Sequence, residues 1–110
     1  MLNLRLYMLQ RITALLMAPL VLGHIAVMIY AIQGGLTTAE ILGRTKGSIA
    51  WFAFYGLFVI AVSVHGAIGM RVVMYEWAGL KGKWLDAFMY GSGIFLLLIG
   101  ARAVWAVTFA

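Results

Sequence analysis

The chain has 110 residues, of which 65% are hydrophobic and only 10% are charged. A soluble domain carries about a quarter of charged residues, and one of this length could not hide so much apolar surface. These values exclude a soluble globular protein. The net charge of +5 follows from basic residues beside apolar runs, which membrane topology explains better than nucleic-acid binding. We therefore expect an all-α membrane protein with a single domain over residues 1–110.

Three stretches predict transmembrane helices. Residues 12–33 and 47–70 carry no charge, and residues 87–110 carry only Arg102. Each is long enough to cross a bilayer, which takes about 20 apolar helical residues, and we predict helices over about residues 8–33, 48–76 and 85–108. The first run is longer than the apolar core of a signal peptide and lacks a small-residue cleavage site, so we expect it to be retained as a span.

The basic residues predict the orientation. Five of them fall on one side of the bilayer: Arg5, Arg11, Arg71, Lys81 and Lys83. Arg44 and Lys46 fall on the other side, with Arg102 near it. The positive-inside rule then places the N-terminus in the cytoplasm, as expected for a multi-pass protein of the inner (plasma) membrane. All four tryptophans fall near the predicted membrane interfaces, which agrees with this topology.

Two local sequence features concern the helices rather than a functional site. The segment Thr37-Thr38-Ala39-Glu40 has the pattern of a capping box, which predicts a short interfacial helix in the first loop. Pro19 lies inside the first predicted helix, where a proline kinks the helix or frees a carbonyl group.

Two histidines, His24 and His65, lie within the predicted spans. Ionisable side chains in hydrocarbon are costly and usually functional, although each histidine could instead hydrogen-bond a neighbouring carbonyl group. A neutral imidazole is a common axial ligand of haem iron. Gly69 lies one turn from His65 and provides room for a flat ligand. Arg11 and Arg71, both at the inner interface, are placed to pair with haem propionates or simply to snorkel to the surface.

These residues resemble a known family. The segment that begins at His65 resembles the His-x3-Gly-x-Arg-x4-acidic pattern on the second helix of the membrane anchors of succinate dehydrogenase and fumarate reductase; its residues are His65, Gly69, Arg71 and Glu76. Gln10-Arg11-Ile12-Thr13 resembles the arginine-containing segment on the first helix of these anchors. The resemblance covers the layout of three helices and most of the chain.

The resemblance implies a cofactor and partners. His65 would ligate haem b, and Arg11 would lie near a haem propionate and a quinone, with Tyr7 and Glu76 as further quinone contacts. Tyr7 departs from the serine of many anchors, Gln10 from a frequent histidine, and Trp77 from a quinone-binding tyrosine. A flavoprotein and an iron–sulfur subunit would dock on the cytoplasmic face through Arg5, Tyr7, the second loop and Glu76. The chain would pass electrons between the iron–sulfur subunit and the quinone.

The depths of the histidines predict two haems rather than one. His24 lies about 20 Å below the cytoplasmic markers and His65 about 9 Å, at 1.5 Å per residue. The axial nitrogens on one iron are only about 4 Å apart, twice a metal–nitrogen bond. Unless the helices tilt strongly, each histidine would therefore need an opposing ligand from a second anchor, identical or related. We expect the chain to form half of a haem-binding helix bundle, with one or two haems per anchor dimer.

Two alternatives come from other classes of protein. In the first, the chain is a haem-free structural or assembly subunit whose histidines hydrogen-bond across helices. In the second it is a small transporter, but this chemistry usually needs an acidic residue within a span, whereas all three acidic residues fall at loops or helix ends. The chain has no phosphate-binding glycine loop, so it is not expected to be a catalytic subunit.

Overall fold

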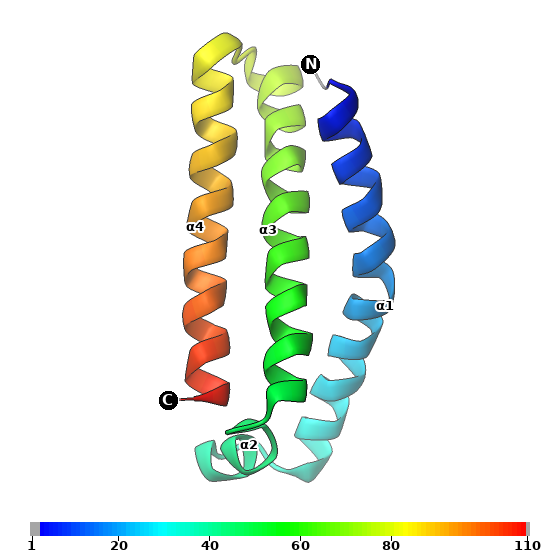
Figure 1. The fold of residues 1–110 in the computed structure, drawn as a ribbon, viewed down its shortest axis with the longest axis vertical. Helices are drawn as coiled ribbons and strands as arrows, with labels where there is room; N and C mark the ends of the chain where they lie inside the picture. The colour runs from blue at the N-terminus through cyan, green and yellow to red at the C-terminus, as the bar shows by residue number, and fades with distance from the viewer. Residues whose placement is uncertain (1–2, 110) are drawn as a thin grey trace.

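Three long helices lie side by side in the computed structural model, which describes residues 3–109 (Figure 1). They are α1 (Leu4–Gly34), α3 (Ile49–Ala78) and α4 (Gly82–Thr108), and the short helix α2 (Thr38–Thr45) lies below them in the view. The middle helix, α3, packs against both α1 and α4. The bundle measures 47 × 24 × 23 Å, so its length matches the thickness of a bilayer with its headgroup regions, about 40–45 Å.

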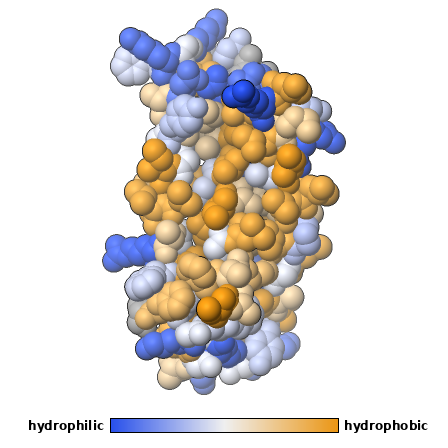
Figure 2. All heavy atoms as spheres, viewed as in Figure 1, coloured by the Kyte–Doolittle hydropathy of each residue, from blue (hydrophilic) through white to orange (hydrophobic). Residues whose placement is uncertain are grey.

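The three predicted spans are confirmed as α1, α3 and α4, each long and apolar enough to cross a membrane. Figure 2 shows a broad hydrophobic band between hydrophilic ends. Large apolar side chains point out of the bundle within this band: Leu15 is 76% exposed, Leu22 is 69% and Leu98 is 64%. Lipid or a partner chain must cover them, because water would not solvate such a surface favourably.

The first helix begins at Leu4, earlier than the predicted start near residue 8. Asn3 explains this start, since its side chain accepts a hydrogen bond from the backbone N–H of Leu6 at 2.9 Å and so satisfies one of the free donors of the first turn. Pro19 lies inside α1, and the ribbon of α1 bows near its middle (Figure 1). A proline removes one hydrogen bond of the helix and produces such a bend.

The predicted capping box is present at the start of α2. Thr37 accepts from the backbone N–H of Glu40 at 3.2 Å, and Glu40 accepts from the backbone N–H of Thr37 at 3.1 Å. The far end of α2 closes the end of α4, because Thr45 Oγ1 donates to the Val107 carbonyl at 2.6 Å. Carbonyl groups of a last helical turn lack partners within the helix, so α2 satisfies one of these at the bottom of the bundle.

A tight turn makes α3 and α4 antiparallel neighbours. Gly79 ends α3 in the left-handed conformation, with φ of 69°, which glycine adopts at no steric cost. The two helices then pack closely where α4 has glycines. A Cβ atom at Gly93 would lie 3.2 Å from the Cβ of Ala67, and one at Gly100 would lie 2.5 Å from Cγ1 of Val59. Small residues at helix contacts of this kind are typical of membrane bundles.

Candidate functional site

His65 lies at the contact between α1 and α3. Its Nδ1 atom is 3.2 Å from Oγ1 of Thr13, a residue of α1 that is only 6% exposed. The same hydroxyl group donates to a carbonyl of its own helix, either that of Leu9 at 2.7 Å or that of Gln10 at 3.1 Å. His65 is therefore held on one ring nitrogen by a buried side chain from another helix.

The open side of His65 faces a hollow between α3 and α4. This His65 hollow has a volume of about 550 Å³ and is lined by His65, Gly66, Gly69, Met70, Val73, Ser92, Phe95 and Leu96. Two glycines in its wall keep the backbone of α3 accessible. A Cβ atom at Gly66 would meet Leu96 at 3.1 Å, and one at Gly69 would meet the side-chain nitrogen of Gln10 at 3.7 Å. The room predicted beside His65 thus exists.

His24 lines a different hollow, nearer the other end of the bundle. This His24 hollow has a volume of about 370 Å³ and is lined by His24, Tyr55, Phe58, Val59, Gly100, Ala103, Val104 and Val107. The imidazole ring lies 5.0 Å from the ring of Phe58 and 6.4 Å from that of Tyr55, between ring centroids. The surroundings of His24 are aromatic and aliphatic, and its ring packs among them.

The two hollows lie along one face of α3. His65 and Phe58 are two turns apart, which at 100° per residue puts them on nearly the same side of the helix. Thr13 marks the level of His65 on α1, and His24 lies three turns further along, about 16 Å at 1.5 Å per residue. The histidines line separate hollows and are too far apart along the helices to share one iron atom.

The described residues contain no cluster of three or more histidine, cysteine or carboxylate side chains that could enclose a metal ion. A haem iron needs only one or two protein ligands, because the porphyrin supplies the other four. The absence of such a cluster in this part of the chain therefore does not bear on whether a single histidine could ligate a haem iron.

The arginines have different partners. Arg71 of α3 donates to Asp86 of α4 at 2.5 Å and to the sulfur of Met89 at 4.0 Å, so its guanidinium group is turned toward α4. Arg11 is exposed and lies over the ring of Tyr7, at 5.8 Å from the centroid. Within residues 3–109 no hydrogen bond engages the Arg11 guanidinium, which leaves its donors for an anion or a quinone oxygen.

The structure brings some of the predicted site residues together and leaves others apart. Tyr7 and Arg11 form one pair at the start of α1, and His65 and Gly69 share the His65 hollow. Glu76 is exposed near the end of α3 and forms no salt bridge in the described part of the chain. Tyr7 and Arg11 therefore lie together, whereas Glu76 is a separate surface group.

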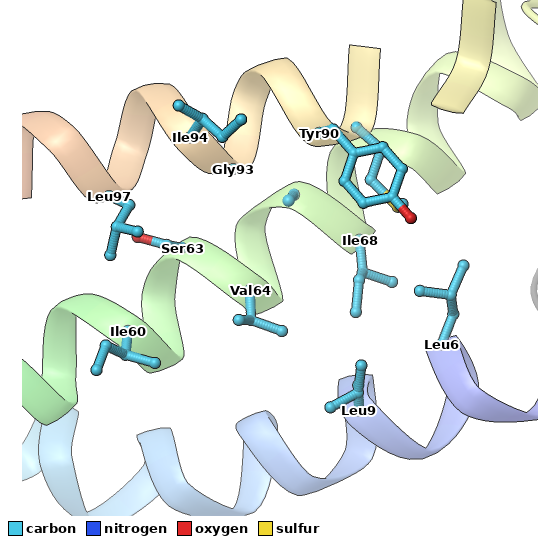
Figure 3. Close-up of a pocket in the computed structure, with 12 residues that line it drawn as sticks. Leu6, Leu9, Ile60, Ser63, Val64, Ile68, Tyr90, Gly93, Ile94 and Leu97 are labelled. Carbon is cyan, nitrogen blue, oxygen red and sulfur yellow. The ribbon is translucent and has the colours of Figure 1, made fainter. Parts of the chain in front are cut away.

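A third groove lies on the opposite face of the bundle and holds no histidine (Figure 3). It has a volume of about 330 Å³ and almost entirely apolar walls from α1, α3 and α4, including Leu9, Val64 and Ile68. Ser63 lies in its floor and is 5% exposed, and its hydroxyl has no hydrogen-bond partner among residues 3–109. This groove contains no histidine, and both histidines line hollows on the other face.

The sequence did not identify two interacting residues: Thr13, which contacts His65, and Asp86, which binds Arg71. Thr13 was visible within the first-helix segment, and it lies about 20° from His24 around α1 at 100° per residue, so both side chains share one face of the helix. A helical wheel could have grouped it with His24. Asp86 appeared only as a charge at the edge of a span, and no pattern in the sequence links it to Arg71.

The comparison with known families agrees with this arrangement. The sequence matches, over residues 2–107, the family described as succinate dehydrogenase/fumarate reductase transmembrane subunit. The chain belongs to this family. No curated protein and no solved structure matches it significantly. The family match covers all three spans and includes both histidines, so the chain is a multi-pass transmembrane subunit of a succinate dehydrogenase or fumarate reductase complex.

Proposed function

We propose that this subunit binds haem b through His65 and passes electrons between an iron–sulfur subunit and a membrane quinone. The observation that carries the proposal is the His65 hollow. The imidazole of His65 contacts the Thr13 hydroxyl through one ring nitrogen, and the residue lines a space together with Gly66 and Gly69. A neutral imidazole beside glycine backbone suits a porphyrin, which needs an axial nitrogen and close approach to a helix. The haem would supply a one-electron carrier in the membrane.

A second anchor subunit, identical or related, would complete the site. The hollow contains one histidine, so a second histidine ligand for the haem would come from that partner. His24 lies in its own hollow on the same face of α3, and we propose that it serves a second haem nearer the outer side. The face that carries both hollows would then be the contact between the two anchors, and the chain would form half of the bundle.

Residues at the cytoplasmic membrane interface would contact the polar groups of the haem and the quinone. Arg11 keeps its donors available and would contact a haem propionate or a quinone oxygen, with Tyr7 beside it. Arg71 already binds Asp86, yet a guanidinium has five N–H donors and can serve a second carboxylate. The cytoplasmic end, with Arg5, the second loop and Glu76, would receive the iron–sulfur subunit and the flavoprotein.

Spectroscopy on the purified complex tests the proposal. A pyridine haemochrome assay should detect b-type haem, whereas a haem-free complex would favour the alternative of a purely structural or assembly subunit. Reduced-minus-oxidised spectra of His65→Ala and His24→Ala should each lose a different haem. If both variants lost the same single haem, the arrangement with two haems would be wrong.

A further inference from the structure

Thr13 is the side chain that fixes His65. It is 6% exposed, comes from α1, and reaches across to Nδ1 of His65 on α3 at 3.2 Å. The other ring nitrogen, Nε2, has no hydrogen-bond partner among the described residues. The two nitrogens of this imidazole are therefore in different situations, because Nδ1 contacts a hydroxyl and Nε2 does not, and the residue lines the His65 hollow.

The proton of the Thr13 hydroxyl decides which nitrogen of His65 carries hydrogen. A threonine hydroxyl has one proton to donate and lone pairs to accept with. The carbonyl of Leu9 lies 2.7 Å from Oγ1, at the usual length of an O–H···O bond, and is closer than the imidazole. The hydroxyl therefore donates to Leu9 and accepts from His65. This requires the hydrogen of the neutral imidazole to be on Nδ1, and it leaves the lone pair on Nε2.

We infer that Thr13 is a positioning residue that holds His65 as the Nδ1–H tautomer, with Nε2 free to ligate iron, and that it thereby sets the redox balance of the haem. The second part rests on the proposed function. A ligating histidine that donates its other N–H to an acceptor becomes a more basic ligand. A more basic imidazole favours the ferric state, so loss of the Thr13 hydroxyl raises the midpoint potential of the haem held by His65.

The tautomer is tested first, without haem. The full chain with the change His24→Ala contains one histidine, so nitrogen-15 NMR of the labelled protein in lipid nanodiscs reports on His65 alone. We expect protonation on Nδ1 in this background and in Thr13→Ser, and a mixture of tautomers in Thr13→Val. Ser63→Ala, which removes another buried hydroxyl from the spans, should leave the spectrum unchanged. Protonation mainly on Nε2, or a Thr13→Val spectrum identical to that of the His24→Ala background, would overturn the inference.

The redox effect is tested on the assembled complex. Potentiometric titration of Thr13→Val should shift the ratio of ferrous to ferric haem about tenfold at a fixed potential, which corresponds to about +59 mV for one electron. Thr13→Ser should restore the wild-type potential, and Thr13→Ala provides a second variant without the hydroxyl. A wild-type complex without haem would refute the proposed function, whereas a haem-containing complex with equal potentials in all variants would refute only the redox role of Thr13.

Discussion

Arg71 of α3 and Asp86 of α4 form an ion pair, with 2.5 Å between Nη1 and Oδ1. The pair lies at the end of the bundle where α3 turns into α4, and it gives Arg71 a partner within its own chain. The side chain of Arg71 is 14% exposed and that of Asp86 is 55% exposed. Because the carboxylate is in contact with solvent, the pair contributes little to stability, about 1 kcal/mol at most.

The variants Asp86→Asn and Arg71→Gln should therefore behave differently. Asp86→Asn is expected to lower the free energy of unfolding by no more than about 1 kcal/mol and to retain haem. Arg71→Gln removes the same ion pair and, in addition, a donor for a propionate, so it should lower haem occupancy. Thermal unfolding and the absorbance of the purified complex measure the two effects. Equal haem content in both variants would show that Arg71 does not contribute to haem binding.

Substitutions at Gly69 test whether haem binding needs the space beside His65. A Cβ atom at Gly69 would meet the Gln10 side chain at 3.7 Å, which is ordinary contact, so Gly69→Ala should fold normally. Gly69→Leu should fill part of the His65 hollow and reduce haem binding by at least about tenfold, the lower range of losses seen when the support of a metal site is disturbed. Haem per protein is the measurement.

Gly56→Leu is the matched control for Gly69→Leu, because it lies on the same helix and a Cβ atom there would meet nothing within 4 Å. It should retain haem. A Gly69→Leu protein with full haem content would mean that the porphyrin does not use the His65 hollow.

Substitution of Gly100 tests how closely α3 and α4 pack. A Cβ atom at Gly100 would lie 2.5 Å from Cγ1 and 3.0 Å from Cγ2 of Val59, so Gly100→Ala should force the helices apart. We expect a loss of about 1–3 kcal/mol, typical of overpacking, measured by unfolding in detergent. Gly91→Ala meets nothing within 4 Å and should be neutral. The double variant Gly100→Ala with Val59→Ala should recover part of the loss, and no recovery would place the strain elsewhere.

The predicted orientation can be measured directly, because the sequence contains no cysteine. Lys83 and Lys46 are exposed and lie at opposite ends of the bundle, after the turn between α3 and α4 and after α2, respectively. In intact cells, a membrane-impermeant maleimide should label Lys46→Cys and spare Lys83→Cys, which should react only after the membrane is opened. The reverse pattern would place the N-terminus outside and contradict the distribution of basic residues.

The sequence by itself determined the number of spans. Charge-free length and a fixed rise per residue are local properties, so residues 12–33, 47–70 and 87–110 predicted α1, α3 and α4, and the pattern at Thr37 predicted the cap of α2. The family resemblance was confirmed by the match over residues 2–107.

Only the tertiary structure decided which side chains meet. That Thr13 holds His65, that Asp86 binds Arg71, and that His24 and His65 line separate hollows depends on the rotation and spacing of whole helices. In a membrane, nearly every face of a span is apolar, so the hydrophobic pattern does not choose the inward face. That choice comes from close packing at small residues such as Gly93 and Gly100 and from a few hydrogen bonds between helices.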